Sequence, residues 1–89
     1  MPLPYVRCVR IIVRLFASQR ETMGRSSFDA ELPEGTTAQG ALARLSAAHP
    51  QLAAPAGSIA FAVNREHVSP EATLRDGDEL ALLPPVAGG

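Results

Sequence analysis

The sequence predicts a single two-layer α+β domain, in which one helix covers one face of a mixed sheet of four to five strands. Two segments near the ends, residues 9–17 and 79–83, alternate their side chains with the period of a strand. Between them, residues 38–48 carry apolar side chains at helical spacing. Because 89 residues suffice for one small domain, we expect the functional group at the surface or at an end.

The first third of the chain reads as two strands joined by a polar stretch. In residues 9–17 the odd positions are apolar, which predicts a strand with one buried face. Residues 18–24 are polar and end on glycine, which is typical of a short helical turn with a glycine cap. Residues 27–32 alternate again and predict the second strand, and a Pro-Glu-Gly turn follows at 33–35.

A helix is predicted next, with Thr36 or Thr37 as its N-cap. Its apolar positions are Ala38, Ala41, Leu42, Leu45 and Ala48. Gly40 should weaken this helix by about 1 kcal/mol relative to alanine. His49 precedes a proline and therefore avoids the helical conformation, so the helix should end there.

The second half predicts a loop and short strands. Residues 51–57 are rich in Ala, Pro and Gly and read as a loop. Residues 59–63 predict an apolar strand. A turn at residues 64–66 would lead from it to a possible partner strand around His67-Val68. Asp76-Gly77-Asp78 is a turn signal before the last strand.

The last strand, residues 79–83, should bury one face and turn the other outward. Leu80 and Leu82 share one face, whereas Ala81 and Leu83 share the other. The following prolines lack the donor that a sheet needs, so they end the strand. We therefore expect an N-terminal extension (1–8), a domain (9–83) and an extended C-terminal tail (84–89).

Composition excludes several classes of function. The net charge is −1, so there is no general attraction to nucleic acid or to an anionic membrane. One cysteine, Cys8, allows no internal disulfide, and the first seven residues lack an apolar core of signal-peptide length. We expect a soluble, cytoplasmic protein.

The basic residues have one chemical peculiarity. All eight are arginine, and the chain contains no lysine. Genome base composition is the simplest explanation. Nevertheless, the chain offers no side-chain amine for an isopeptide bond or a Schiff base.

The C-terminal residues are the most informative part of the sequence, and they read Pro84, Pro85, Val86, Ala87, Gly88 and Gly89. Two glycines have no Cβ and can enter a channel too narrow for side chains. The proline pair favours a stiff, extended base, which limits the ordering entropy lost on capture. Activated by ATP, the terminal carboxylate would become an acyl-adenylate that a sulfur nucleophile converts to a thiocarboxylate. A frayed tail of small residues is the plainer alternative.

Three blocks of sequence resemble the ubiquitin-like sulfur carriers, and among them the small subunits of molybdopterin synthase. They are Leu-Phe-Ala-Ser-Gln-Arg-Glu at 15–21 with Gly24, Val-Asn-Arg-Glu at 63–66, and residues 74–89. The last block is the most specific, because it joins an Asp-Gly-Asp-Glu turn, a strand and the ending Pro-Pro-Val-Ala-Gly-Gly. The resemblance covers about residues 10–89.

This resemblance implies a β-grasp fold, in which the first and last strands are neighbours, and a catalytic cycle. A ubiquitin-activating-type enzyme would adenylate Gly89 with ATP, and a sulfur donor would form the thiocarboxylate. The tail would then enter the large subunit of the synthase and donate sulfur to cyclic pyranopterin monophosphate. The large subunit would supply the acid and base groups, in a heterotetramer of two large and two small subunits, and no cofactor is expected on this chain.

The same resemblance implies that Phe16 and Leu83 face the partner. Both occupy the strand face opposite the predicted core, although a second layer of residues could instead cover them. Two other functions stay open. The tail could serve thiamine, cysteine or tRNA thiolation or protein conjugation, or the domain could be a non-catalytic β-grasp interaction module.

Other candidate residues favour structural explanations. Cys8 lies at a strand edge with no basic cluster beyond Arg7 and Arg10, and His49 suits the end of a helix. His67 lies in a hairpin or loop, so the two histidines do not suggest a metal site. The acidic segment 76–79 lacks the length and spacing of an EF-hand and reads as a turn with solvated carboxylates. Arg10 and Arg14 are most simply the polar face of the first strand.

Overall fold

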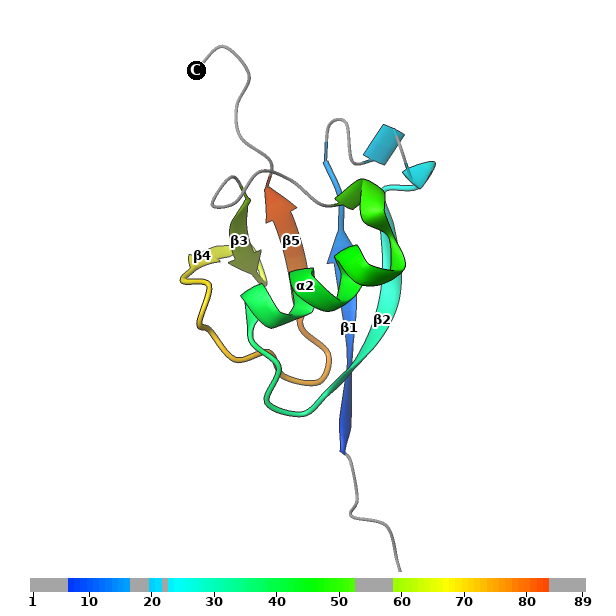
Figure 1. The fold of residues 1–89 in the computed structure, drawn as a ribbon. Coiled ribbons are helices and arrows are strands. Elements are labelled where there is room, and N and C mark those ends of the chain that lie inside the picture. The colour runs from blue at the N-terminus through cyan, green and yellow to red at the C-terminus, as the bar shows by residue number, and fades with distance from the viewer. Residues whose placement is uncertain (1–6, 17–19, 22, 53–58, 84–89) are drawn as a thin grey trace, which may run out of the picture.

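The computed structural model describes residues 7–16, 20–21, 23–52 and 59–83. Within them, one mixed sheet has the strand order β2-β1-β5-β3-β4, and helix α2 crosses one of its faces (Figure 1). The elements are β1 (Cys8–Arg14), β2 (Ser27–Pro33), α2 (Ala38–Ala48), the 3₁₀ turn η1 (Pro50–Leu52), β3 (Ala60–Val63), β4 (Glu66–Val68) and β5 (Glu79–Leu83). The predicted two-layer α+β architecture is confirmed.

Strand β1 follows the predicted alternation. Val9, Ile11 and Val13 are buried, and the residues between them face the other side of the sheet. The strand begins at Cys8, and the carbonyl of Arg7 accepts a hydrogen bond of 2.7 Å from the amide of residue 34. Sheet pairing therefore includes Cys8 and reaches Arg7, both of which were predicted to belong to the extension.

The two outermost strands in sequence meet in the middle of the sheet. β1 pairs with β5 in parallel, with Val13 opposite Leu80, and with β2 in antiparallel orientation. Leu80 and Leu82 are fully buried between the sheet and the helix, as predicted for that face of the strand. The pairing of first and last strands, expected by analogy, is thus confirmed.

The polar segment before β2 contains the expected helical turn. Arg20, Glu21 and Met23 are helical, and the amide of Gly24 donates to the carbonyl of Arg20 at 3.0 Å. Gly24 has a φ of 73°, which a residue without a Cβ adopts at little cost. The prediction of a short turn with a glycine cap is confirmed.

The amino end of α2 is fully hydrogen-bonded. Thr37 is the N-cap, and its hydroxyl accepts a bond of 3.0 Å from the amide of Gly40. The amides of Ala38 and Gln39 donate to carbonyls of the 70–72 segment, both at 2.9 Å. The first amides of a helix have no partner within the helix, so these contacts explain why it starts here.

The glycine inside α2 has a local reason. A Cβ at Gly40 would lie 3.2 Å from the Thr37 hydroxyl oxygen, which is closer than most such contacts. Alanine would gain about 1 kcal/mol in helix propensity but would crowd the cap that starts the helix. The low propensity noted in the sequence is therefore offset by the fit of the cap.

Replacing Thr37 by alanine should lower the free energy of unfolding by about 1 kcal/mol, because the Gly40 amide loses its acceptor. In a domain of this size, the melting temperature should fall by about 4–8 °C. Thermal unfolding followed by circular dichroism measures this, with Thr73→Ala as the control. Thr73 is exposed and should tolerate the change. Equal melting temperatures for Thr37→Ala and the wild type would contradict the assignment of the cap.

The β3–β4 hairpin is tighter than predicted. Glu66 lies in β4 opposite Val63, so the turn consists of Asn64 and Arg65 alone, not of residues 64–66. Both turn residues have positive φ, 52° and 72°. Two-residue hairpins favour such a turn because its twist matches that of the strands.

The segment after α2 was predicted as a loop over residues 51–57, and its first part is different. Pro50–Leu52 form the 3₁₀ turn η1, and Leu52 is buried in the core at 1% exposure. One leucine within an Ala- and Pro-rich stretch has no periodicity, so its burial was not predictable. Residues 53–58 lie outside the described residues.

Candidate functional site

The sheet face opposite α2 carries a hollow of about 320 Å³. Strands β1, β3, β4 and β5 all contribute to it, so it spans segments that are far apart in sequence. Its lining residues are Arg14, Phe16, Ala62, Arg65, His67, Glu79, Ala81 and Leu83. Small side chains at the centre and long ones around them produce the concave shape.

The apolar part of the hollow contains both residues predicted to face a partner. Phe16 is 36% exposed, which is unusual for a phenylalanine, and Leu83 is half-buried. Ala62 and Ala81 lie buried beside them, opposite each other on the paired strands β3 and β5. The structure thus brings Phe16 and Leu83 to one surface, and their contact with a partner stays a prediction.

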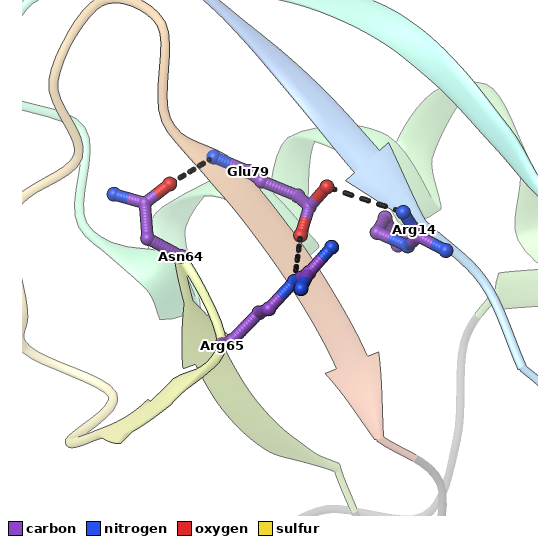
Figure 2. A network of polar contacts seen from close by, with 4 residues as sticks. All are labelled: Arg14, Asn64, Arg65 and Glu79. Atoms are coloured by element: carbon purple, nitrogen blue, oxygen red, sulfur yellow. Dashed lines mark hydrogen bonds and ion pairs between the residues drawn. The ribbon is translucent and has the colours of Figure 1, made fainter.

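The polar part of the hollow is a charge network around Glu79 (Figure 2). Arg14 Nη1 lies 3.2 Å from Glu79 Oε2, and Arg65 Nε lies 4.0 Å from Oε1. The Glu79 side chain is 24% exposed, and the Arg14 side chain is 43% exposed. Glu79 is thus the more shielded of the two side chains, and Arg14 compensates its charge at close range.

Asn64 fixes the position of this network. Its side-chain oxygen accepts a hydrogen bond of 3.0 Å from the backbone amide of Glu79, and its backbone amide donates one of 2.9 Å to the backbone carbonyl of Glu79. Its side-chain nitrogen donates to Asp78 Oδ1 at 3.0 Å. The hairpin tip is therefore joined to the start of β5, and Arg65 is held beside Glu79.

The Asp-Gly-Asp segment before β5 is a hydrogen-bonded turn. Asp78 Oδ2 accepts from the amide of Arg75, and Asp76 Oδ1 accepts from the amide of Arg10, both at 2.8 Å. Gly77 has a φ of 88° and donates to the Arg10 carbonyl. These carboxylates bind backbone amides, which confirms the interpretation as a turn.

The remaining chemistry-bearing side chains are spread over the fold. Cys8 is exposed at the start of β1, and His49 caps the end of α2 with its ring 5.7 Å from that of Phe28. His67 lies in β4, where it lines the hollow. In the described ranges, no three His, Cys, Asp or Glu side chains are grouped to hold a metal ion. No helix of this part of the chain has the length and apolar character to cross a membrane.

The predicted reactive group lies outside the described residues. This applies to the whole tail, residues 84–89, including the terminal Gly89. Leu83, which precedes it, ends β5 and lines the hollow. The hollow is consequently the described surface closest along the chain to the tail.

Sequence patterns alone did not identify the polar residues of the hollow. Arg14 was assigned to a polar strand face, Arg65 to a turn and His67 to a hairpin or loop. They meet because β3 pairs with β5 and β5 with β1, which no local pattern indicates. Only the resemblance pointed to this face, through Phe16 and Leu83.

Comparison with curated proteins gives consistent relatives. The chain is 40% identical over 83 residues to the molybdopterin synthase sulfur carrier subunit of Chlamydomonas reinhardtii, covering 91% of this chain and 100% of that protein. It is 36% identical over 81 residues to the protein of the same name from Arabidopsis thaliana, covering 91% and 84%. These alignments extend over nearly the whole domain.

Solved structures agree with this relationship. The crystal structure of SAMP1 from Haloferax volcanii has a TM-score of 0.75 at 31% identity, covering 90% of this chain and 99% of that one. A complex of subunits 1 and 2 of the molybdopterin-converting factor from Helicobacter pylori contains a chain with a TM-score of 0.60 at 26% identity, covering 91% and 100%. A Caldiarchaeum subterraneum ubiquitin, 16% identical with a TM-score of 0.64, shares the fold over 93% of this chain and 100% of that one.

The fold is therefore the ubiquitin-like β-grasp, as predicted. The sequence matches the ThiS family over residues 13–89, which includes the hollow and the glycine ending. The two curated relatives each align with 91% of this chain, and their names agree with one another. The chain therefore belongs to the ThiS family, and the two curated relatives described above are molybdopterin synthase sulfur carrier subunits.

Proposed function

We propose that this chain is the sulfur-carrying subunit of a molybdopterin synthase. The observation that carries the proposal is the 40% identity to a curated subunit of that name over its full length. The site supports it, because the hollow contains an exposed phenylalanine and its residue Leu83 leads in sequence to a tail that ends in Gly-Gly. Apolar side chains that gather on one surface, as Phe16 and Leu83 do here, are typical of surfaces that another protein covers.

The proposed chemistry takes place on the carboxylate of Gly89. The carboxylate attacks the α-phosphate of ATP and releases pyrophosphate, so that an acyl-adenylate forms on a separate activating enzyme. A sulfide-level nucleophile such as hydrosulfide then attacks the acyl carbon and displaces AMP, which leaves a thiocarboxylate. In the synthase, the thiocarboxylate sulfur forms a bond to a carbon of cyclic pyranopterin monophosphate, and water cleaves the acyl–sulfur bond, so that the sulfur stays on the pterin and the Gly89 carboxylate is restored. The large subunit supplies the proton transfers.

The large subunit is the proposed partner at the hollow. The Helicobacter pylori neighbour was solved as a complex of its two subunits, which supports an assembly of this kind. Because Leu83 lies at the hollow and leads directly into the tail, docking there would aim the tail at the partner. The chain itself requires no bound cofactor for this role.

Intact mass spectrometry tests the carrier function. Incubated with ATP, a sulfur source and the matching activating enzyme, the chain should gain about 16 Da, which is the replacement of one oxygen by sulfur in this acyl-group chemistry. The same mixture without ATP is the control and should leave the mass unchanged. An unchanged mass in the complete mixture, under conditions that load a known carrier, would refute the proposal.

Protein modification is the second candidate function, and one observation favours it. Two of the similar solved structures are of small archaeal modifier protein 1 from Haloferax volcanii, at 31% and 29% identity. In the mass experiment with host proteins added, a modifier would form isopeptide adducts on their lysines. Because this chain has no lysine, its own side chains cannot accept a second copy through an isopeptide bond, so lysine-linked chains of copies would not form.

A further inference from the structure

The rim of the hollow holds two guanidinium groups around one carboxylate. Figure 2 shows Arg14 reaching Glu79 from β1 and Arg65 reaching it from the hairpin tip. The Arg14 contact is short at 3.2 Å, whereas the Arg65 contact at 4.0 Å is at the limit for an ion pair. Among the lining residues, two arginines thus face one acid, and the rim has an excess of positive charge.

Arg65 is the arginine available to a partner. Its side chain is 86% exposed, and an ion pair this open and this long contributes little stability. The guanidinium of Arg65 can therefore donate hydrogen bonds to a partner with little loss of folding free energy. Arg14, by contrast, is half-buried and compensates Glu79 at close range.

The backbone at Arg65 indicates that this placement has a cost. The residue has a φ of 72°, a conformation that costs side chains with a Cβ about 1–2 kcal/mol. Glycine is favoured at this position of the turn, and it would relieve the strain. The turn nevertheless presents an arginine, and Asn64 joins the turn to the backbone of Glu79 through its side-chain oxygen and its backbone amide. Strain maintained in this way is typical of functional positions.

We propose that the hollow binds a segment of the large subunit that presents a carboxylate beside an apolar side chain, and that Arg65 selects for the carboxylate. The apolar side chain lies against Phe16 and Leu83, and the carboxylate takes a paired hydrogen bond from the planar guanidinium of Arg65. Glu79 is then a weak internal competitor for Arg65, which the carboxylate of the partner replaces, while Arg14 stays paired with Glu79. This inference rests on the proposed function, since it concerns the same partner.

Calorimetric titration with the large subunit tests the inference at low and moderate salt. Arg65→Gln should weaken binding by about fivefold and Arg65→Glu by more than about tenfold, with a smaller salt dependence than the wild type. Glu79→Gln should bind about twofold to fivefold more tightly, because the competitor loses its charge. A merely structural role for the network would instead weaken binding in that variant. Arg44→Gln is the matched control, since Arg44 is exposed on α2, on the other side of the sheet.

The outcomes separate the two proposals. If the wild type binds the large subunit and Arg65→Glu binds equally well, the inference is wrong and the proposed function stands. Weaker binding of Glu79→Gln, with its unfolding transition unchanged, would also overturn the inference. If the wild type does not bind the large subunit, the proposed function fails, and the inference fails with it.

Discussion

Removal of Gly89 should abolish sulfur transfer while the fold remains intact. The variant ends at Gly88, so its carboxylate stops about 3.5 Å short of the position at which the full tail would react. A displacement of even 1 Å can cost about 100-fold in rate, so the loss should be at least that large. The last described element of the fold, β5, ends at Leu83, so the melting temperature should not change. Molybdopterin formation in a reconstituted synthase is the measurement.

A deletion at the other end is the matched control. A variant without residues 1–6 likewise loses only residues outside the described domain, and it keeps the glycine ending. It should retain sulfur transfer. Full activity of the variant without Gly89 would show that the carboxylate of Gly89 is not the sulfur-carrying group.

Phe16→Ala should weaken binding to the large subunit by about 2 kcal/mol or more, which is about 30-fold in Kd. Aromatic residues that are exposed in the free protein and covered in a complex are frequent hot spots of binding. Phe16 lines the hollow and is 36% exposed, so its loss should change the free energy of unfolding by only about 1 kcal/mol. Titration calorimetry and urea unfolding measure the two quantities separately.

Ile12 offers a control of the same kind. It is 42% exposed on the same sheet face of β1, but it does not line the hollow. Ile12→Ala should therefore weaken binding much less than Phe16→Ala. Equal losses in both variants would show that the partner covers the face broadly and that the hollow is not the centre of the interface.

The elements with a regular pattern were predictable. The alternation in β1 and β2 identified the buried faces correctly, and Leu80 and Leu82 occupy the core as predicted. The N-cap was narrowed only to Thr36 or Thr37. The choice of Thr37 depends on carbonyls of the 70–72 segment, which accept from the first amides of α2. That contact is remote in sequence, so no local pattern contains it.

The candidate site was predictable in its chemistry and not in its geometry. The glycine ending is a local feature, and resemblance assigned Phe16 and Leu83 to one face. The polar rim depends on strand register, because Arg14, Arg65 and Glu79 meet only after β5 is placed between β1 and β3. A single sequence does not specify that order, although the family resemblance suggested part of it.

The central position of β5 also has a kinetic consequence. This strand comes last in the domain, yet it joins β1 to the β3–β4 hairpin. The two halves of the sheet can each form early, but they cannot unite until residues 79–83 insert between them. Contacts so distant in sequence require closure of a long loop, and they make folding slower than in a helical bundle of equal length. The surface that we assign to the partner therefore exists only when β5 is in place between β1 and β3.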